Sequence, residues 1–363
     1  MTSPSEARPS APLGRAALIG TGLIGGSIGM ALRARGWHVT GRDFDTARAE
    51  RALALGALDE IGSDPEAEVT FVATPVSSVA AIARQVVTPT GIVTDVGSVK
   101  GPIVEAVNHP RFVGGHPMAG SEQEGVDGAD ATLFEGATWV LTPTATTDPQ
   151  AYARLQSIVS SLGADVLAIA PDRHDALVAV VSHVPHLTAA ALMTLAAAGA
   201  EEHTALLRLA AGGFRDMTRI AAGHPGIWPD ICTENRDAIV GVLDGLLETL
   251  GGLRSVVAAG DRETLLRTLE RARHARVNLP TRAAIADDLV EVRVPIPDRP
   301  GVLAEVTTLA GDLGVNIEDL EIAHSAEGER GVLLLVIDAR SADLLRGAFL
   351  ARGYRPSVQP LVS

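Results

Sequence analysis

Apolar and polar positions follow one pattern up to about residue 168, where short apolar runs alternate with helical segments. This alternation predicts a parallel, doubly wound sheet with helices on both faces. In such sheets ligands bind at the carboxyl ends of the strands. The runs that read as strands are Ala16–Ile19, Trp37–Gly41, Val69–Ala73, Ile92–Asp95, Phe112–Gly114 and Thr138–Leu141. The segments expected to line one crevice are Thr74-Pro75, Gly97-Ser98 and Gly115-His116-Pro117.

The pattern changes after about residue 170. Strand signals vanish between residues 171 and 287, and Ala/Leu-rich stretches such as Leu187–Ala198 and Ile239–Val257 predict an all-helical domain. Several of these helices are apolar over more than one face, so they must be buried within the domain or against a second subunit. We therefore expect a homodimer.

A third pattern occupies residues 288–363. Val290, Val292 and Val294 alternate with polar residues, as in a half-buried strand. A helix, a strand that opens at Val315, a continuous apolar strand, a second helix and a last strand follow. This β-α-β-β-α-β order predicts a ferredoxin-like unit.

These patterns give three expected domains, at residues 13–170, 171–287 and 288–363. The first twelve residues are polar and Pro-rich, so they read as a disordered leader and not as a signal peptide. The net charge of −14 argues against nucleic acid or an anionic membrane as a partner. No run of 18 apolar residues predicts a membrane span, and the single cysteine, Cys232, suits the reducing cytoplasm.

The segment Gly20-Thr21-Gly22-Leu23-Ile24-Gly25 fits G-x-G-x-x-G between a predicted strand and a predicted helix. In this pattern the first glycine permits a tight turn, the second lets the backbone approach a pyrophosphate, and the third lets helix and strand pack closely. Asp43 closes the second strand-like run and can accept hydrogen bonds from ribose hydroxyls. The sequence therefore predicts a Rossmann-like dinucleotide site. Its candidate residues are Gly20, Gly22, Leu23, Ile24, Gly25, Asp43, Thr74 and Pro75.

Two charged positions refine this picture. The Asp43 carboxylate repels a 2′-phosphate and favours NAD, whereas the adjacent Arg42 is the kind of residue that accommodates NADP. We expect NAD and leave NADP open. Lys100 is the only lysine in the chain, which suggests that this position needs a compact ammonium group unless one lysine survived by chance.

Several segments resemble the prephenate/arogenate dehydrogenases, in the right order across roughly residues 15–285. They are Gly22–Ser27, Thr94–Lys100, Gly114–Gly120, Ser182–His186 and Gly212–Arg219. The resemblance implies NAD-dependent oxidative decarboxylation of prephenate to 4-hydroxyphenylpyruvate, a step of tyrosine biosynthesis. The substrate would be a small dicarboxylate that loses a hydride from C4, the C4 hydroxyl proton and CO2.

By this resemblance His116 is the catalytic histidine, and its position just past a predicted strand end suits removal of the hydroxyl proton. Ser98 is expected to share the hydrogen-bond network of His116. Arg219 would bind the ring carboxylate through its planar guanidinium group. Lys100 would assist electrostatically or support its loop.

A second group of histidines follows in the helical domain. By resemblance His183 reaches the substrate side chain, with His186 behind it. His174-Asp175 is expected to form an orienting carboxylate–imidazole contact, and Trp228 either walls the pocket or fills the core. No metal site is predicted, because no third ligand is arranged around the two histidines.

The last unit resembles an ACT domain, a small amino-acid-sensing module, through its opening Asp298-Arg299-Pro300-Gly301-Val302-Leu303. The resemblance implies feedback by tyrosine. Asp298, Gly301 and Val302 would receive the effector carboxylate, and Asn316, at the start of the next strand, would contact the amine. The alternative is a dimerisation module without a ligand.

Three other functions remain open from the sequence. Arogenate differs from prephenate only by an amino group in place of the keto group, so it is the alternative substrate. A hydroxyacid dehydrogenase of the same plan usually presents a lysine in the second domain, and this chain has none there. A dinucleotide-sensing regulator without turnover is the non-enzymatic alternative.

Overall fold

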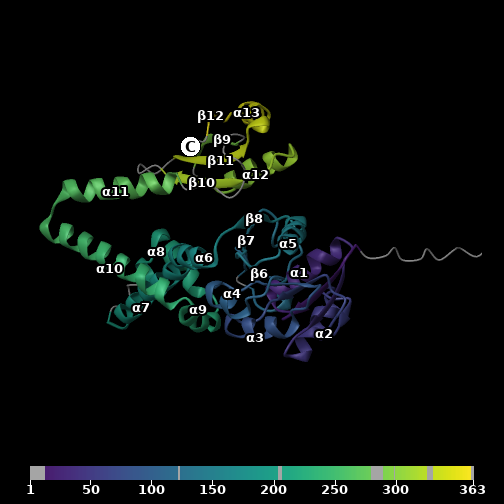
Figure 1. Cartoon of the computed structure of the whole chain (residues 1–363). Helices are drawn as coiled ribbons and strands as arrows, with labels where there is room; N and C mark the ends of the chain where they lie inside the picture. Colours follow the sequence, from purple (N-terminus) through teal and green to yellow (C-terminus); the bar gives the residue numbers. More distant parts are fainter. Residues whose placement is uncertain are drawn as a thin grey trace, which may run out of the picture. The chain divides into compact units, whose positions relative to one another are not determined.

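The computed structural model describes residues 13–121, 123–202, 207–278, 289–297, 299–324 and 330–360. The predicted leader lies outside these residues. The chain divides into two compact units, Met1–Gly251 and Gly252–Ser363, and each is described by itself (Figure 1). The boundary falls inside the helix α10 (Arg236–Ala259), whereas the sequence pattern suggested divisions near residues 170 and 287.

The first unit contains an eight-stranded sheet of order β3-β2-β1-β4-β5-β6-β7-β8. Neighbouring strands are parallel, as predicted, except that β7 runs antiparallel to β6. The order reverses between β1 and β4, which is where such sheets bind ligands. The strands are β1 Arg15–Ile19, β2 His38–Arg42, β3 Glu60–Ile61, β4 Val69–Val72, β5 Ile92–Asp95, β6 Phe112–Pro117, β7 Thr138–Thr142 and β8 Asp165–Ala168.

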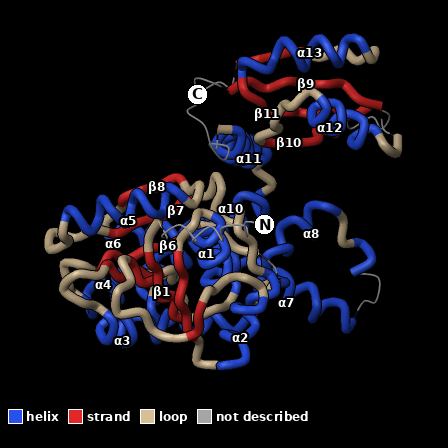
Figure 2. Tube along the Cα trace, turned by 90° about the vertical axis from the view of Figure 1, so that its right-hand side faces the viewer, coloured by secondary structure: helices blue, strands red, loops and turns tan. Residues whose placement is uncertain are grey.

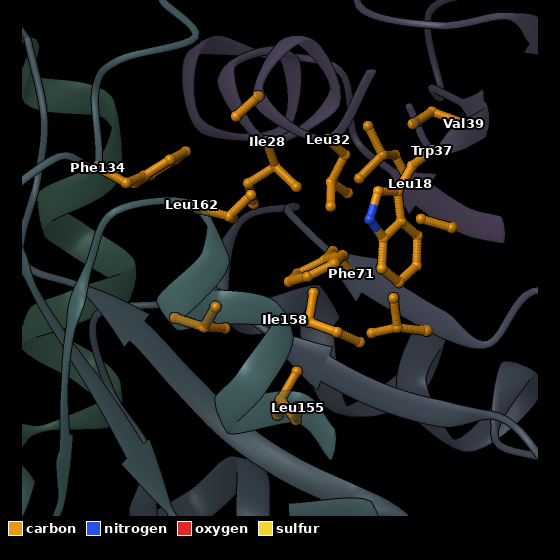
Figure 3. Packing of buried hydrophobic residues seen from close by; sticks show 14 of the residues in the cluster. Leu18, Ile28, Leu32, Trp37, Val39, Phe71, Phe134, Leu155, Ile158 and Leu162 are labelled. Atoms are coloured by element: carbon orange, nitrogen blue, oxygen red, sulfur yellow. The ribbon is translucent and has the colours of Figure 1, made fainter. Parts of the chain in front are cut away.

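Helices cover both faces of this sheet because successive strand residues point to opposite sides. Leu18 and Phe71 join one buried cluster with α1 and α5, as Figure 3 shows. Ile19 and Val72 join a second cluster with α3 and α4. The helices of this part are α1 Leu23–Ala34, α2 Thr46–Ala54, α3 Val76–Val86, α4 Gly101–Val107 and α5 Pro149–Ser161.

The remainder of the first unit is helical, as predicted. A continuous helical run comprises α6, a π-helical turn at Ala179–His183 and α7. Its stretch Pro171–Gly199 is long and apolar enough to cross a membrane by length and composition, a test that helices of soluble proteins also pass. Within this run the buried side chain of His174 lies 2.9 Å from the ring of His116 in β6. The helices are α6 Pro171–Val178, α7 Val184–Glu202, α8 Gly212–Thr218, α9 Trp228–Glu234 and α10.

The second unit begins within α10, continues with α11 (Arg262–Val277) and then follows the β-α-β-β-α-β order that the sequence predicts. Its antiparallel sheet has the order β10-β11-β9-β12, and helices α12 and α13 share one core cluster with it (Figure 2). The strand expected to open at Val315 instead begins at Asp319. The elements are β9 Leu289–Pro297, α12 Val302–Asp312, β10 Asp319–His324, β11 Arg330–Asp338, α13 Ala342–Ala351 and β12 Ser357–Pro360.

Candidate functional site

The glycine loop has the geometry that a dinucleotide requires. Gly20 has a φ of +94°, and a Cβ there would lie 2.2 Å from the carbonyl oxygen of Ala73. A Cβ at Gly25 would lie 2.0 Å from the carbonyl oxygen of Gly20, so this glycine allows α1 to pack against β1. At Gly22 nothing outside the neighbouring residues lies within 4 Å of the Cβ position. The second glycine therefore leaves open space where a pyrophosphate would lie.

The start of α1 and Asp43 lie next to the glycine loop and complete the candidate dinucleotide site. No side chain caps the N-terminus of α1, which starts at Leu23, so its first N–H groups are available to phosphate oxygens. Asp43 follows β2 directly and accepts hydrogen bonds from the backbone N–H of Thr21 (2.7 Å) and of Asp45 (3.0 Å). The same carboxylate thus orders the glycine turn. These residues fit a dinucleotide with free ribose hydroxyls.

The loop after β5 carries Ser98 and is anchored by a buried ion pair. Lys100 and Asp95 are both fully buried and bind each other. Asp95 also accepts hydrogen bonds from the backbone N–H of Gly97 (2.9 Å) and of Gly115 (3.2 Å). The ion pair therefore ties this loop to β5 and β6, and the Lys100 side chain has no exposed surface.

His116 lies within β6, not past its end as the sequence suggested, because pairing with β7 extends the strand. Its Nδ1 is 2.9 Å from Nε2 of His174, whose Nδ1 is 2.8 Å from Oδ1 of Asp175. Burial lowers the pKa of His116 well below 6.5, and the neighbouring His174 and Lys100 act in the same direction. The imidazole is therefore neutral near pH 7 and able to accept a proton.

His183, the last residue of the π-helical turn, and His186 of α7 differ in depth. His183 is 1% exposed, and its Nδ1 is 3.1 Å from Nδ2 of Asn235. Burial lowers its pKa to about 4. His186 is partly exposed and stacks on Trp228 with ring centroids 3.6 Å apart. The structure therefore buries the histidine predicted to reach the substrate and exposes the one predicted to lie behind it.

Asn235 is a site residue that the sequence analysis missed. Its side chain is 5% exposed and also donates a hydrogen bond to the backbone carbonyl of Asp175 (2.9 Å). It joins the end of α9 to α6 and to the π-helical turn. No local pattern distinguishes this asparagine, so only the tertiary contacts identify it.

Arg219 begins a 3₁₀ turn, Arg219–Ala222, that lies against α7. Gly223 ends this turn, and a Cβ there would lie 3.8 Å from Cε1 of His186. The arginine side chain is exposed. The turn that carries the predicted carboxylate-binding residue is therefore next to the more exposed histidine.

The strand-end residues Thr74 and Pro75 precede α3, and the Thr74 hydroxyl accepts a hydrogen bond from Ser78 (3.0 Å). Ser77, on the same helix, donates a hydrogen bond to Asp230 of α9 (2.5 Å). This contact ties α3 to α9. Among the described residues, no three His, Cys, Asp or Glu side chains are grouped as metal ligands.

The second unit has a cavity of about 370 Å³ at the start of α12. Gly301, with a φ of +88°, and Val302 line it, whereas Asn316 is not among its lining residues. Asn316 is exposed, precedes β10 and donates a hydrogen bond to Glu318 (2.6 Å). The predicted effector residue Asp298 lies outside the described residues.

Family models match most of the first unit and the helix that follows it. Residues 28–168 match the model described as prephenate dehydrogenase, nucleotide-binding domain, and residues 170–271 match prephenate dehydrogenase, dimerization domain. The ferredoxin-like elements lie outside both matches.

Curated relatives and solved structures agree with these matches. A prephenate dehydrogenase of Bacillus subtilis is 35% identical over 87% of this chain and 90% of the relative. A cyclohexadienyl dehydrogenase of Zymomonas mobilis is 34% identical over 73% of this chain and 96% of the relative. The structure of A. aeolicus prephenate dehydrogenase with hydroxyphenyl propionate and NAD+ has a TM-score of 0.70 and 30% identity, covering 75% of this chain and all of that one. Synechocystis arogenate dehydrogenase has a TM-score of 0.64 and 33% identity, covering 72% and 98% of the two chains.

Proposed function

Because this chain belongs to the prephenate dehydrogenase family, we propose that it converts prephenate and NAD+ to 4-hydroxyphenylpyruvate, CO2 and NADH. The observation that carries the proposal is that a neutral, hydrogen-bonded His116 lies in the same unit as the glycine loop Gly20–Gly25, which leaves space for a pyrophosphate at Gly22. A hydride acceptor and a base are the two groups that this reaction needs from the site.

We assign the dinucleotide to the glycine loop. Gly22 provides room for the pyrophosphate, the N-terminus of α1 provides N–H donors, and Asp43 provides an acceptor for the ribose hydroxyls. When bound, NAD supplies the acceptor for the C4 hydride. The Asp43 carboxylate disfavours the 2′-phosphate of NADP.

His116 takes the proton of the C4 hydroxyl as the hydride leaves C4. The bond between the ring and its carboxylate then breaks, CO2 departs, and the released electron pair makes the ring aromatic. The proton on His116 returns to the phenolate oxygen, so the reaction needs no oxidant besides NAD+. Ser98, in the neighbouring strand-end loop, holds the hydroxyl by a hydrogen bond.

The two carboxylates of the substrate need separate partners. We assign the ring carboxylate to Arg219, whose planar group binds a carboxylate with two hydrogen bonds. We assign the side chain to His186, since it is partly exposed and stacked on Trp228 beside the turn of Arg219. His183 supports this arrangement through an edge contact with the Trp228 ring and is itself held by Asn235.

The test is an assay of purified protein with prephenate and arogenate, each with NAD and NADP, followed by the absorbance of the reduced cofactor. We expect prephenate with NAD to be the best combination. Arogenate is the second candidate, because a structural relative is an arogenate dehydrogenase. If the protein turns over neither prephenate nor arogenate, the proposal is wrong, and the dinucleotide-sensing regulator remains as the alternative. In the His116→Gln variant kcat is expected to fall by about 10²–10⁴-fold.

We further propose that the second unit is an ACT domain that binds tyrosine in the cavity at Gly301 and Val302. The cavity offers the N-terminus of α12 to a carboxylate, beside apolar residues such as Leu303 and Ile322. Arg299 also lines it, with its guanidinium paired to Glu305 (2.9 Å). Tyrosine is expected to inhibit the wild type. Leu303→Trp, which fills the cavity, should keep activity and lose the inhibition. No response of the wild type at millimolar tyrosine contradicts the proposal.

We also propose that the helical surface of the first unit forms a homodimer. Leu195 of α7 and Leu247 of α10 are 71% and 65% exposed, although both belong to apolar helices. A second copy of the same surface would cover them. Sedimentation should give the mass of a dimer, and Leu247→Asp should shift it toward the monomer. A wild type that sediments as a monomer excludes this assembly.

A further inference from the structure

A chain of hydrogen bonds runs from the N-terminus of α4 to His116. The Asp175 carboxylate accepts the backbone N–H of Lys100 at Oδ1 and of Gly101 at Oδ2, both at 2.7 Å. A backbone N–H only donates, so both carboxylate oxygens act as acceptors. The nitrogen Nδ1 of His174, 2.8 Å from Oδ1, must therefore carry the proton in this contact.

The proton on Nδ1 decides the role of the other ring nitrogen of His174. In a neutral imidazole with Nδ1–H, Nε2 has the lone pair and accepts a hydrogen bond. This Nε2 lies 2.9 Å from Nδ1 of His116, which must then donate. His174 is 1% exposed, so no water competes for the contact. The nitrogen left with a lone pair on His116 is Nε2.

The opposite tautomer of His116, with the proton on Nε2, would cost free energy. If His116 were protonated on Nε2 instead, its Nδ1 would need a donor, and His174 would have to be an imidazolium ion. That ion would be a second buried cation beside the fully buried Lys100. His116 would also present a donor to the substrate hydroxyl, and a donor cannot take up a proton.

We infer that His174 and Asp175 are positioning residues that hold His116 in the Nδ1–H tautomer, with the Nε2 lone pair ready for the hydroxyl proton of the substrate. This inference rests on the proposed function. Asp175 is also the residue that binds the start of α4, directly after the loop of Ser98. One carboxylate from the helical part therefore fixes both the loop and the tautomer. When His116 becomes protonated, its Nδ1–H keeps the same acceptor, so the site need not rearrange.

Two substitutions at position 174 separate positioning from packing. His174→Phe keeps a buried ring and removes the acceptor, whereas His174→Gln offers an amide oxygen close to the position of Nε2. We expect kcat of His174→Phe to fall about 10²-fold, with the KM for NAD unchanged. His174→Gln should recover most of the loss. His274→Phe is the matched control, because His274 is exposed on α11 of the other unit.

The tautomer itself is read by ¹⁵N-imidazole NMR of the wild-type protein, with His116→Ala to assign the signals. The expected pattern is a protonated Nδ1 and a bare Nε2 on residue 116. A protonated Nε2 overturns the inference, as does a folded His174→Phe variant with wild-type kcat. The NMR experiment needs no substrate, so it decides the tautomer even if His174→Phe fails to fold. Failure of the proposed function would show instead as a wild type without turnover.

Discussion

Lys100 and Asp95 form an ion pair in which neither side chain is exposed to solvent. The same carboxylate binds the backbone of Gly97 in the loop after β5 and of Gly115 in β6, next to His116. Burial lowers the pKa of Lys100, and the attraction of Asp95 opposes this shift. The pair therefore holds two strand ends together.

Removing one partner of this pair should be costly. We expect Lys100→Met to lower the free energy of unfolding by about 3–5 kcal/mol, because Asp95 is left buried and uncompensated. Urea denaturation measures the change. The double variant Lys100→Met/Asp95→Asn should recover part of the loss, since no buried charge remains.

Arg267→Met is the control for this prediction, because the Arg267–Glu263 pair is exposed on α11. It should change the free energy of unfolding by less than about 1 kcal/mol. A Lys100→Met variant as stable as the wild type would show that the buried pair does not hold the strand ends together.

The three motif glycines should respond differently to alanine. Gly22→Ala places a methyl group in open space, so the melting temperature should stay unchanged while the KM for NAD rises about tenfold, or 1.4 kcal/mol. Gly25→Ala and Gly20→Ala meet backbone oxygens at 2.0 and 2.2 Å and should lose stability. Thermal unfolding and NAD titration separate the two effects. Unaltered NAD binding by Gly22→Ala would argue against a pyrophosphate at this loop.

Arg219 should act on substrate binding and not on stability. Loss of a charged hydrogen bond costs about 1.5–3 kcal/mol, so Arg219→Ala should raise the KM for prephenate by about 10- to 150-fold. The KM of Arg219→Lys should lie between those of the wild type and Arg219→Ala, because an ammonium group cannot bind a carboxylate through two parallel bonds. The control Arg215→Ala removes an exposed arginine that donates to the carbonyl of Ala210 (3.2 Å), and its KM should not change. Equal KM values for the two alanine variants would refute the assignment.

Stability should fall in mild acid because the pKa values of His183 and His116 are lowered in the folded chain. The pKa of His183 is lowered to about 4 and that of His116 well below 6.5. Below about pH 6.5 the unfolded chain binds these protons and the folded chain does not, so stability present above pH 6.5 is lost toward pH 4. Each group contributes up to about 1.4 kcal/mol per pH unit.

The measurement is urea denaturation between about pH 5 and pH 7.5. His183→Gln should flatten the dependence on pH, whereas His274→Gln, at an exposed position, should leave it unchanged. If the wild type is equally stable at both ends of this range, the two histidines are not held neutral.

The antiparallel strand β7 shows where local patterns stop being informative. Apolar periodicity located the strand, but its direction depends on the chain reversal between β6 and β7, which no residue of β7 encodes. The same pairing extends β6 through His116 and so places the histidine inside a strand. Periodicity predicts that a segment is buried, but it does not predict which neighbouring strand or helix packs against it.

The histidines of α7 show a second limit. Three-residue spacing predicts that His183 and His186 share a helix face. Both rings do contact the same side chain, Trp228: His183 edge-on with ring centroids 6.2 Å apart, and His186 stacked at 3.6 Å. The two rings differ in depth instead, because His183 is 1% exposed and bound to Asn235 whereas His186 is partly exposed. Spacing along the chain predicts that two residues share a helix face, and the elements packed against that face decide how deeply each is buried.

The sequence by itself determined what depends on neighbours along the chain. The glycines of the loop, the acid after β2, six of the eight strands of the first sheet and the element order of the ferredoxin-like unit follow from backbone sterics and apolar periodicity, which act over a few residues. Only the tertiary structure decided which distant groups meet. His116 and His174 lie 58 positions apart and Lys100 and Asp175 lie 75 apart, yet each pair is within hydrogen-bond distance. Such contacts exist because the sheet and the helical run bury polar groups together, and each buried group then requires a partner.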